Sequence, residues 1–127
     1  MFLLAKKLST NINTDNNTAQ KKNFKDAPTI NYILPDFYKF CYNATIVAHN
    51  LPFDMGFIHN VAKRFSYNFN NNTMDTLELS KKKIGGLKNY KLGTIVEHLG
   101  IVLENAHRAV NDATATAKVF IKIMQNY

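Results

Sequence analysis

Two short segments of the chain carry residue types that could perform hydrolytic chemistry. One runs from His49 to Asp54 and sets a histidine, an asparagine and an acid before an apolar-periodic stretch; the other places His107 five residues before Asp112. Carboxylates held near helix starts can bind a divalent metal ion, and a histidine close to them can take a proton from water. Metal-dependent phosphodiester hydrolysis uses this combination, provided that further acids join it.

Each of these acids also has a purely structural interpretation. Asp54 precedes Phe57 and Ile58 by three and four residues, so it shares their face in the first helical turn. An acid at this position also complements the helix dipole, which is worth about 0.3–1 kcal/mol. Asp112 lies about one turn into the last predicted helix, off its apolar stripe, and a solvated acid is the alternative there. The two segments together support a functional interpretation more strongly than either segment does alone.

The three polar residues beside these acids have similar alternatives. His49 and Asn50 follow the end of a predicted strand, which is where α/β sheets place their ligands. Turn formation is the alternative for Asn50, and a loop histidine without function is the alternative for both His49 and His107. A functional interpretation of these residues is supported only because each of them accompanies an acid at a helix start.

Hydrophobic periodicity predicts an α/β domain in which helices outnumber strands. A helix begins near Pro28, and Pro35 is expected to kink or divide it. Met74–Leu79 is ambiguous between strand and helix, and the basic segment Lys81–Gly86 is predicted to be a flexible loop. The other predicted elements are a weak strand over residues 2–10, a loop over residues 11–26, a buried strand over residues 45–48 and an asparagine-rich loop over residues 68–72.

The predicted helix faces define the expected core. They are, in chain order, Ile30, Leu34, Phe37, Tyr38 and Cys41; Phe57, Ile58, Val61 and Phe65; Leu92, Ile95, Val96 and Leu99, ending at Gly100; and Val110, Ala113, Ala117, Phe120, Ile121 and Met124.

Composition limits the possible classes of protein. The chain has 127 residues, enough for one domain with its own core, and its formal charge of +7 favours a polyanionic partner such as nucleic acid. A lysine-rich solvated surface is the alternative. Because no apolar run approaches the roughly 18 residues that cross a bilayer, no membrane partner is expected. The single cysteine, Cys41, excludes an internal disulfide, fits the reducing cytoplasm and is predicted to be a small buried hydrophobe.

Both segments resemble motifs of one enzyme family. Val47–Ile58 (VAHNLPFDMGFI) resembles the second exonuclease motif of the DEDDh family of 3′–5′ exonucleases. That family includes epsilon-type proofreading subunits and the exonuclease domain of Gram-positive replicative DNA polymerases. Ala106–Ala113 (AHRAVNDA) resembles its third motif, His-x-Ala-x-x-Asp in essence. Weaker similarity to the family's first helix and connecting segments is found at Ala27–Ile30, Leu34–Phe37, Asp75–Leu77 and Leu87–Leu92.

The resemblance runs from about Asp26 to the C-terminus. It therefore implies a degenerate segment at residues 1–25 and an exonuclease-like domain at residues 26–127. The implied fold is the ribonuclease H-like α/β fold, with its first strand or hairpin missing.

The resemblance also implies roles by position. Asp112 would bind a metal ion directly, and Asp54 would support the metal ions directly or through water. His107 would be the general base that deprotonates the attacking water. Asn50 and Phe53 would lie at the 3′-terminal nucleotide. Phe57 also falls in this region, but its place in the helix stripe favours core packing.

The implied cofactors are two Mg²⁺ or Mn²⁺ ions about 4 Å apart, which clamp the scissile phosphate for in-line attack. The implied substrate is the 3′ end of single-stranded DNA, and the implied partner is a replicative polymerase. No sequence preference is expected, because single-strand binders of this kind use phosphate attraction and base stacking.

The family's first motif, an Asp-x-Glu that supplies two more metal ligands, does not occur in the 127 residues. The three glutamates Glu78, Glu97 and Glu104 are preceded two positions earlier by threonine, isoleucine and valine. Two divalent cations carry four positive charges, whereas Asp54 and Asp112 supply two negative ones. Sequence position offers no reason to place Asp75 or Glu78 at the site.

Three origins are open for this pattern: a fragment whose start lies upstream, missing residues supplied by another polypeptide, or a decayed paralogue. Three functions are also open: a 3′–5′ exonuclease domain, a catalytically dead nucleic-acid-binding module, and a truncated non-functional product. The dead module would keep a basic surface, for which Lys81, Lys82, Lys83 and Lys88 are the candidates.

Overall fold

The structure, a computed structural model, describes residues 29–103 and 108–127. Within these ranges five helices accompany one pair of strands, which confirms the predicted α/β class. The elements are α2 (Ile30–Cys41), β1 (Ile46–Ala48), α3 (Leu51–Arg64), β2 (Thr73–Asp75), α4 (Thr76–Lys83), α5 (Leu92–His98) and α6 (Arg108–Asn126).

Strands β1 and β2 are parallel, and α3 is the crossover that connects them. Ile46 pairs with Thr73 and Ala48 with Asp75, and the Ile46 amide donates to the Asn72 carbonyl oxygen at 2.8 Å. Because the strands are parallel, their carboxyl ends meet at one edge and their amino ends at the opposite edge. Polar residues follow or precede the strands at both edges.

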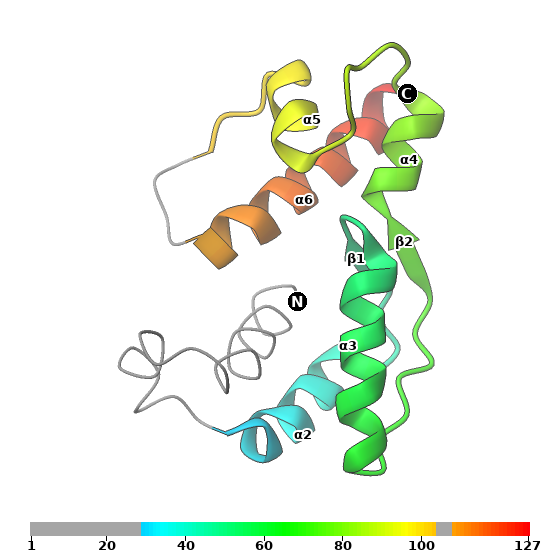
Figure 1. Cartoon of the computed structure of the whole chain (residues 1–127), viewed down its shortest axis with the longest axis vertical. Helices are drawn as coiled ribbons and strands as arrows, with labels where there is room; N and C mark the ends of the chain where they lie inside the picture. The colour runs from blue at the N-terminus through cyan, green and yellow to red at the C-terminus, as the bar shows by residue number, and fades with distance from the viewer. Residues whose placement is uncertain (1–28, 104–107) are drawn as a thin grey trace.

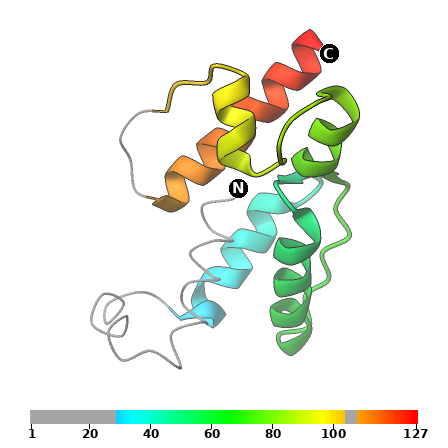
Figure 2. The ribbon, with the colours of Figure 1, turned by 45° about the horizontal axis from the view of Figure 1, so that its top comes forward.

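The helices gather their buried side chains into two clusters. Figure 1 shows α2 and α3 on one side of the strands and α4, α5 and α6 on the other. The first cluster comprises Leu34, Phe37, Cys41, Ile46, Met55, Ile58, Val61, Ala62 and Phe69. The second comprises Ile84, Ile95, Leu99, Val119 and Ile123. Figure 2 shows α5 lying across α6, and α6 also contacts α4 and β1, so that it joins the second cluster to the sheet.

Most of the predicted core is confirmed. Cys41 is fully buried, as expected of a small hydrophobe, and burial raises the pKa of its thiol. Phe57 packs against the first cluster, in agreement with the core role favoured for it. Met74–Leu79 resolves into both of its alternatives, since β2 ends at Asp75 and α4 begins at Thr76.

Three details of the prediction are wrong. Pro35 lies inside the single helix α2 and does not divide it; the backbone bond that it removes would end on Asn31, which is exposed, so water can replace it. Phe65 is 40% exposed, because it caps the end of α3. The basic residues Lys81–Lys83 form the last turn of α4, where cations complement the helix dipole, and are not part of a loop.

The expected stripe on α6 is also wrong. The buried face is Ala115, Thr116, Val119 and Ile123, whereas Ile121 and Met124 are 52% and 57% exposed. Apolar residues occupy two faces of α6, and contacts with α4 and α5 select the one that is buried. The expected stripe instead borders a groove of about 220 Å³, lined by Thr45, Val47, Ala113, Thr116, Ala117, Phe120 and Ile121.

The strand predicted at residues 2–10, the loop predicted at residues 11–26 and the proposed boundary at residue 25 lie outside the described residues. None of the helices in the described ranges is both long enough and apolar enough to span a bilayer.

Candidate functional site

Asp75 holds together the carboxyl ends of the two strands. Its Oδ1 accepts hydrogen bonds from the amides of Asn50 and Leu77, both at 2.9 Å, and its Oδ2 accepts from the amide of Leu51 at 3.1 Å. Asp75 is thus the N-cap of α4 and also binds the first amides of α3. One carboxylate therefore satisfies donors at the starts of two helices, where backbone N–H groups have no partner within their own helix.

Asn50 adopts a left-handed conformation, with φ 64° and ψ 54°, at the turn between β1 and α3. Asparagine tolerates this region better than most residues because its short side chain can bond locally. Its backbone amide is bonded to Asp75, and the residue is exposed. The conformation lets the chain reverse from the strand into α3 within a few residues.

His49 is fixed at both ring nitrogens. Nε2 lies 2.9 Å from the Tyr90 carbonyl oxygen, which can only accept, so Nε2 carries a proton; Nδ1 lies 3.0 Å from Thr76 Oγ1. Burial lowers the pKa of His49, against the opposing influence of the Tyr90 carbonyl and the Asp75 carboxylate. The ring therefore links the end of β1 to α4 and to the segment before α5, which gives His49 a structural role.

A hollow of about 490 Å³ opens beside these residues. It is lined by His49, Asn50, Leu77, Lys81, Tyr90, Lys91 and Leu92. Lys81 and Lys91 are both exposed, and Lys81 also pairs with Glu78 at 2.8 Å; that pairing lowers the pKa of Glu78. The positive charges of Lys81 and Lys91, with the side-chain amide of Asn50, lie at the carboxyl ends of parallel strands and suit a phosphate-bearing ligand.

Asp54 and Phe53 lie in the first turn of α3, next to this edge of the sheet. Asp54 is half-buried, and Phe53 is 69% exposed. An exposed ring at the start of a helix can stack on a base. The structure thus places the predicted residues Asn50, Phe53 and Asp54 within one helical turn, at the end of the sheet where ligands bind in α/β folds.

Asp112 is half-buried near the start of α6, and α6 and α3 both contact β1. His107 lies outside the described residues, so its predicted role as general base stays a prediction. Asp54 and Asp112 thus lie near the starts of α3 and α6, two helices that both contact β1.

In the ranges that the structure describes, no group of three or more histidine, cysteine or acidic side chains is placed to hold a metal ion. Asp54 and Asp112 would balance only two of the four charges that a pair of divalent cations brings. The described residues therefore do not fit a two-metal centre by themselves.

Sequence reasoning missed four residues of this site: Asp75, Thr76, Tyr90 and Lys91. Asp75 lies against Asn50, although its place in the sequence gave no reason to expect this, and its carboxylate is bonded to three backbone amides. Two signals were available: Asp75–Leu77 and Leu87–Leu92 resemble the family's connecting segments, and the Asp75-Thr76-Leu77 string is a typical helix N-cap sequence. Its proximity to Asn50, 25 residues earlier, follows from parallel strand pairing that the sequence pattern does not specify.

Comparison with known proteins identifies the family to which the sequence is similar. The profile of the exonuclease family (RNase T) matches residues 7–120. The chain is 48% identical over 101 residues to the DNA polymerase III PolC-type of Caldanaerobacter subterraneus subsp. tengcongensis, which is 80% of the chain and 7% of that protein. It is 39% identical over 99 residues to the DNA polymerase III subunit epsilon of Aquifex aeolicus, covering 77% of the chain and 49% of that subunit.

A third relative, the 3′-5′ exonuclease DinG of Staphylococcus epidermidis, is 39% identical over 102 residues, which is 80% of the chain and 11% of that protein. The chain thus spans about half of the epsilon subunit and about a tenth or less of the other two. The matches confirm that the two sequence motifs belong to the exonuclease family, together with its ribonuclease H-like α/β fold class.

Proposed function

The chain belongs to the exonuclease family, and on this premise we propose that it forms part of a 3′–5′ exonuclease acting on the 3′ ends of single-stranded DNA. The observation that carries the proposal is that Asn50 lines the hollow together with two lysines, while Phe53 and Asp54 follow it in the first turn of α3. These three residues come from the segment that resembles the second exonuclease motif.

The hollow supplies the binding part of the proposal. Lys81 and Lys91 attract the phosphates of the strand. The exposed Phe53 ring stacks on the terminal base, and the side-chain amide of Asn50 contacts the terminal nucleotide. His49 has no proton-transfer role in this proposal, because both of its ring nitrogens are engaged in holding the fold.

The catalytic part of the proposal assigns Asp54 and Asp112 as two of the carboxylates that bind Mg²⁺ or Mn²⁺, and His107 as the general base. Since these two carboxylates do not fit a two-metal centre alone, the proposal requires further carboxylates from outside the described residues. No hydrolytic step is derived from the two of them.

A polymerase is the partner we propose for this exonuclease. Relatives at 48% and 39% identity are named as a DNA polymerase III PolC-type and a DNA polymerase III subunit epsilon. A domain that removes 3′-terminal nucleotides beside a polymerase would serve proofreading during DNA replication.

The test is release of labelled nucleotide from a 3′-labelled single strand, with Mg²⁺ or Mn²⁺, for the wild-type chain and Asp112→Asn. The expected result is metal-dependent release that falls by about 100-fold or more in the variant, because the amide cannot replace a carboxylate ligand. Asp36→Asn, which changes an exposed acid on α2, is the matched control and should keep the wild-type rate. Equal release by Asp112→Asn and the wild type would remove Asp112 from the mechanism.

A second candidate is a nucleic-acid-binding module that does not cleave. The absence of Asp-x-Glu from the 127 residues and the lack of a three-ligand group in the described ranges both favour it. This module would bind single-stranded DNA with an affinity that falls steeply with salt. A plot of the logarithm of the binding constant against the logarithm of the salt concentration should have a slope of about −0.7 for each phosphate neutralised. Binding of this kind without metal-dependent release would select it over the exonuclease.

A further inference from the structure

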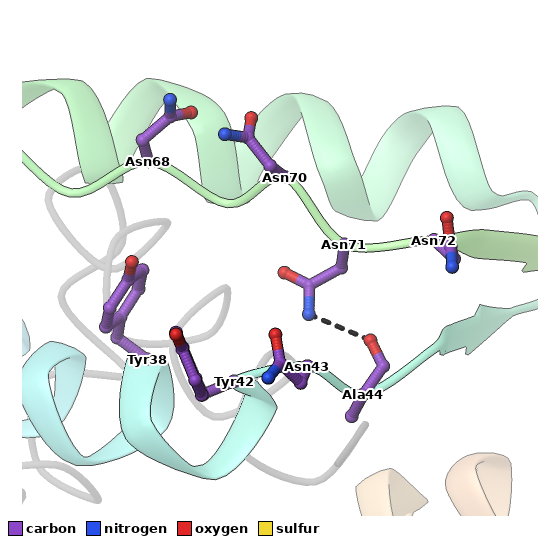
Figure 3. A pocket seen from close by; sticks show the side chains of 8 residues that line it. All are labelled: Tyr38, Tyr42, Asn43, Ala44, Asn68, Asn70, Asn71 and Asn72. Atoms are coloured by element: carbon purple, nitrogen blue, oxygen red, sulfur yellow. Dashed lines mark hydrogen bonds between the residues drawn. The ribbon is translucent and has the colours of Figure 1, made fainter.

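The amino ends of β1 and β2 border a second hollow, far along α3 from the candidate site. It has a volume of about 370 Å³, and we call it the amide pocket (Figure 3). Its lining comprises Tyr38, Tyr42, Asn43, Ala44, Asn68, Asn70, Asn71 and Asn72. Two tyrosines and five asparagines therefore meet around a volume typical of small-molecule sites, about 300–1,000 Å³.

The two tyrosine rings differ in how they are held. Tyr38 is packed against two other rings, with centroid distances of 5.0 Å to Tyr67 and 5.2 Å to Phe69. Tyr42, the residue after α2, is 68% exposed. The pocket thus has one ring that is fixed by neighbouring aromatics and one ring that is available to a ligand. An exposed tyrosine ring beside polar groups is a suitable surface for stacking.

The amides of Asn43 and Asn71 are the polar groups that lie nearest these rings in Figure 3. Asn71 Nδ2 donates to the carbonyl oxygens of Cys41 and Ala44, so its side chain is held across the gap, as Figure 3 shows for the bond to Ala44. Asn43 has a φ of 55°, in the left-handed region, which places it in the turn between α2 and β1. Figure 3 shows Asn68 and Asn70 across the gap from the two tyrosines, with their side chains directed away from the rings, whereas Asn71 reaches from the same loop into the gap.

The chemistry of the lining selects the ligand. None of the described residues that line the pocket is acidic or basic, so they offer no charged partner to a ligand. A ligand that is flat, neutral and bordered by alternating donors and acceptors matches both the rings and the amides. Nucleobases have these properties: every base stacks on aromatic rings, and asparagine pairs with adenine through its N6 and N7 atoms.

We propose that the amide pocket binds an unpaired nucleobase of single-stranded DNA, with adenine preferred, stacked on Tyr42 and bonded by the asparagine amides. The identification of the strand rests on the proposed function. Asn50 precedes α3 and Asn68 follows it, so the 14 residues of the helix separate the two sites by about 21 Å. The pocket would hold a nucleotide several positions away from the 3′ end bound at the candidate site.

The test measures binding of fluorescent oligo(dA) and oligo(dT) to the whole chain in EDTA, by anisotropy, so that no cleavage occurs. We expect oligo(dA) to bind more tightly than oligo(dT), and Tyr42→Ala to weaken oligo(dA) binding about tenfold. Tyr42→Phe keeps the ring and should bind like the wild type. Tyr32→Ala removes another exposed tyrosine of α2 that is not part of the pocket, and it should have no effect. Equal losses in Tyr42→Ala and Tyr32→Ala, or no loss in either, would overturn the proposal.

A second variant addresses the amides without disturbing the backbone. Glycine adopts positive φ freely, so Asn43→Gly should fold normally while removing one amide from the pocket. We expect it to reduce the preference for oligo(dA) over oligo(dT). An unchanged preference in both Asn43→Gly and Tyr42→Ala would contradict base recognition here.

Titration with adenosine separates a nucleobase from a sugar ligand. In NMR spectra of the ¹⁵N-labelled chain, adenosine should shift the side-chain amide signal of Asn71, whereas glucose should not. A shift caused by glucose and not by adenosine would assign the pocket to carbohydrate and overturn the proposal. Because these measurements need no metal ion, Asp112→Asn should retain the adenine preference, and loss of cleavage would not affect the result.

Discussion

The two ends of the β1–β2 pair carry polar side chains that are bonded in different ways. At the carboxyl ends, Asp75 accepts three backbone hydrogen bonds and His49 has a partner at each ring nitrogen. At the amino ends, Asn71 ties two carbonyl groups together, while the other asparagines line an open pocket. The polar groups at the carboxyl ends of the strands thus form hydrogen bonds that stabilise the fold next to the candidate site. The amino ends present more polar groups than the fold requires.

The largest expected effect on stability is that of Asp75→Ala. This substitution removes the acceptor for the amides of Asn50, Leu51 and Leu77 at the starts of α3 and α4. We expect the free energy of unfolding to fall by about 2–4 kcal/mol, measured by urea denaturation.

Two further variants calibrate this result. Asp75→Asn retains one acceptor oxygen and should lie between the wild type and the alanine variant. Asp36→Ala, at an exposed acid of α2, should change stability by less than about 0.5 kcal/mol. If Asp75→Ala behaved like Asp36→Ala, the carboxyl ends would not depend on this carboxylate.

Asn71→Ala tests the amino ends and should have a smaller effect, about 1–2 kcal/mol. The variant loses two hydrogen bonds that join the loop before β2 to the end of α2. Asn70→Ala alters an exposed neighbour in the same loop and serves as its control. A cost for Asn71→Ala greater than that for Asp75→Ala would reverse the comparison between the two ends.

The smallest expected effect is a dependence of stability on pH at the carboxyl ends. Because the pKa of His49 is lowered in the folded state, the unfolded chain binds a proton more readily as pH falls below the ordinary value of 6.5. The free energy of unfolding should therefore decline from about pH 6.5 downward until the folded protein also takes up the proton. Urea titrations of the wild type and His49→Gln at a series of pH values measure this decline. An identical decline in both would assign it to other groups.

Local patterns were enough to predict much of the fold. The β-branched run at Ile46 and Val47 predicted β1, and the apolar spacing of Leu34, Phe37 and Cys41 predicted the buried face of α2. For α6 the same reasoning selected the wrong face, because that helix is apolar on two sides and only tertiary contacts with α4 and α5 decide which is buried. Periodicity states that a face is apolar and does not state what covers it.

The candidate site was predicted in part for the same reason. Asn50, Phe53 and Asp54 are contiguous, so one motif was sufficient to find them. Asp75 comes to Asn50 through the pairing of Ala48 with Asp75, and this register is a long-range property. Tyr90 and Lys91 reach the hollow through the path of the segment before α5, which follows no periodic pattern.

One edge of β1 has no paired strand among the described residues, and this has a consequence for hydrogen exchange. Ile46 donates its amide toward β2, so the Val47 amide, one residue later, faces the opposite edge, where the described residues provide no paired strand. Amide protons of β1 should therefore exchange in alternation, slowly at Ile46 and Ala48 and rapidly at Val47. Any strand that adds to this edge would slow Val47 alone, which makes its amide proton a built-in reporter of completion of the sheet.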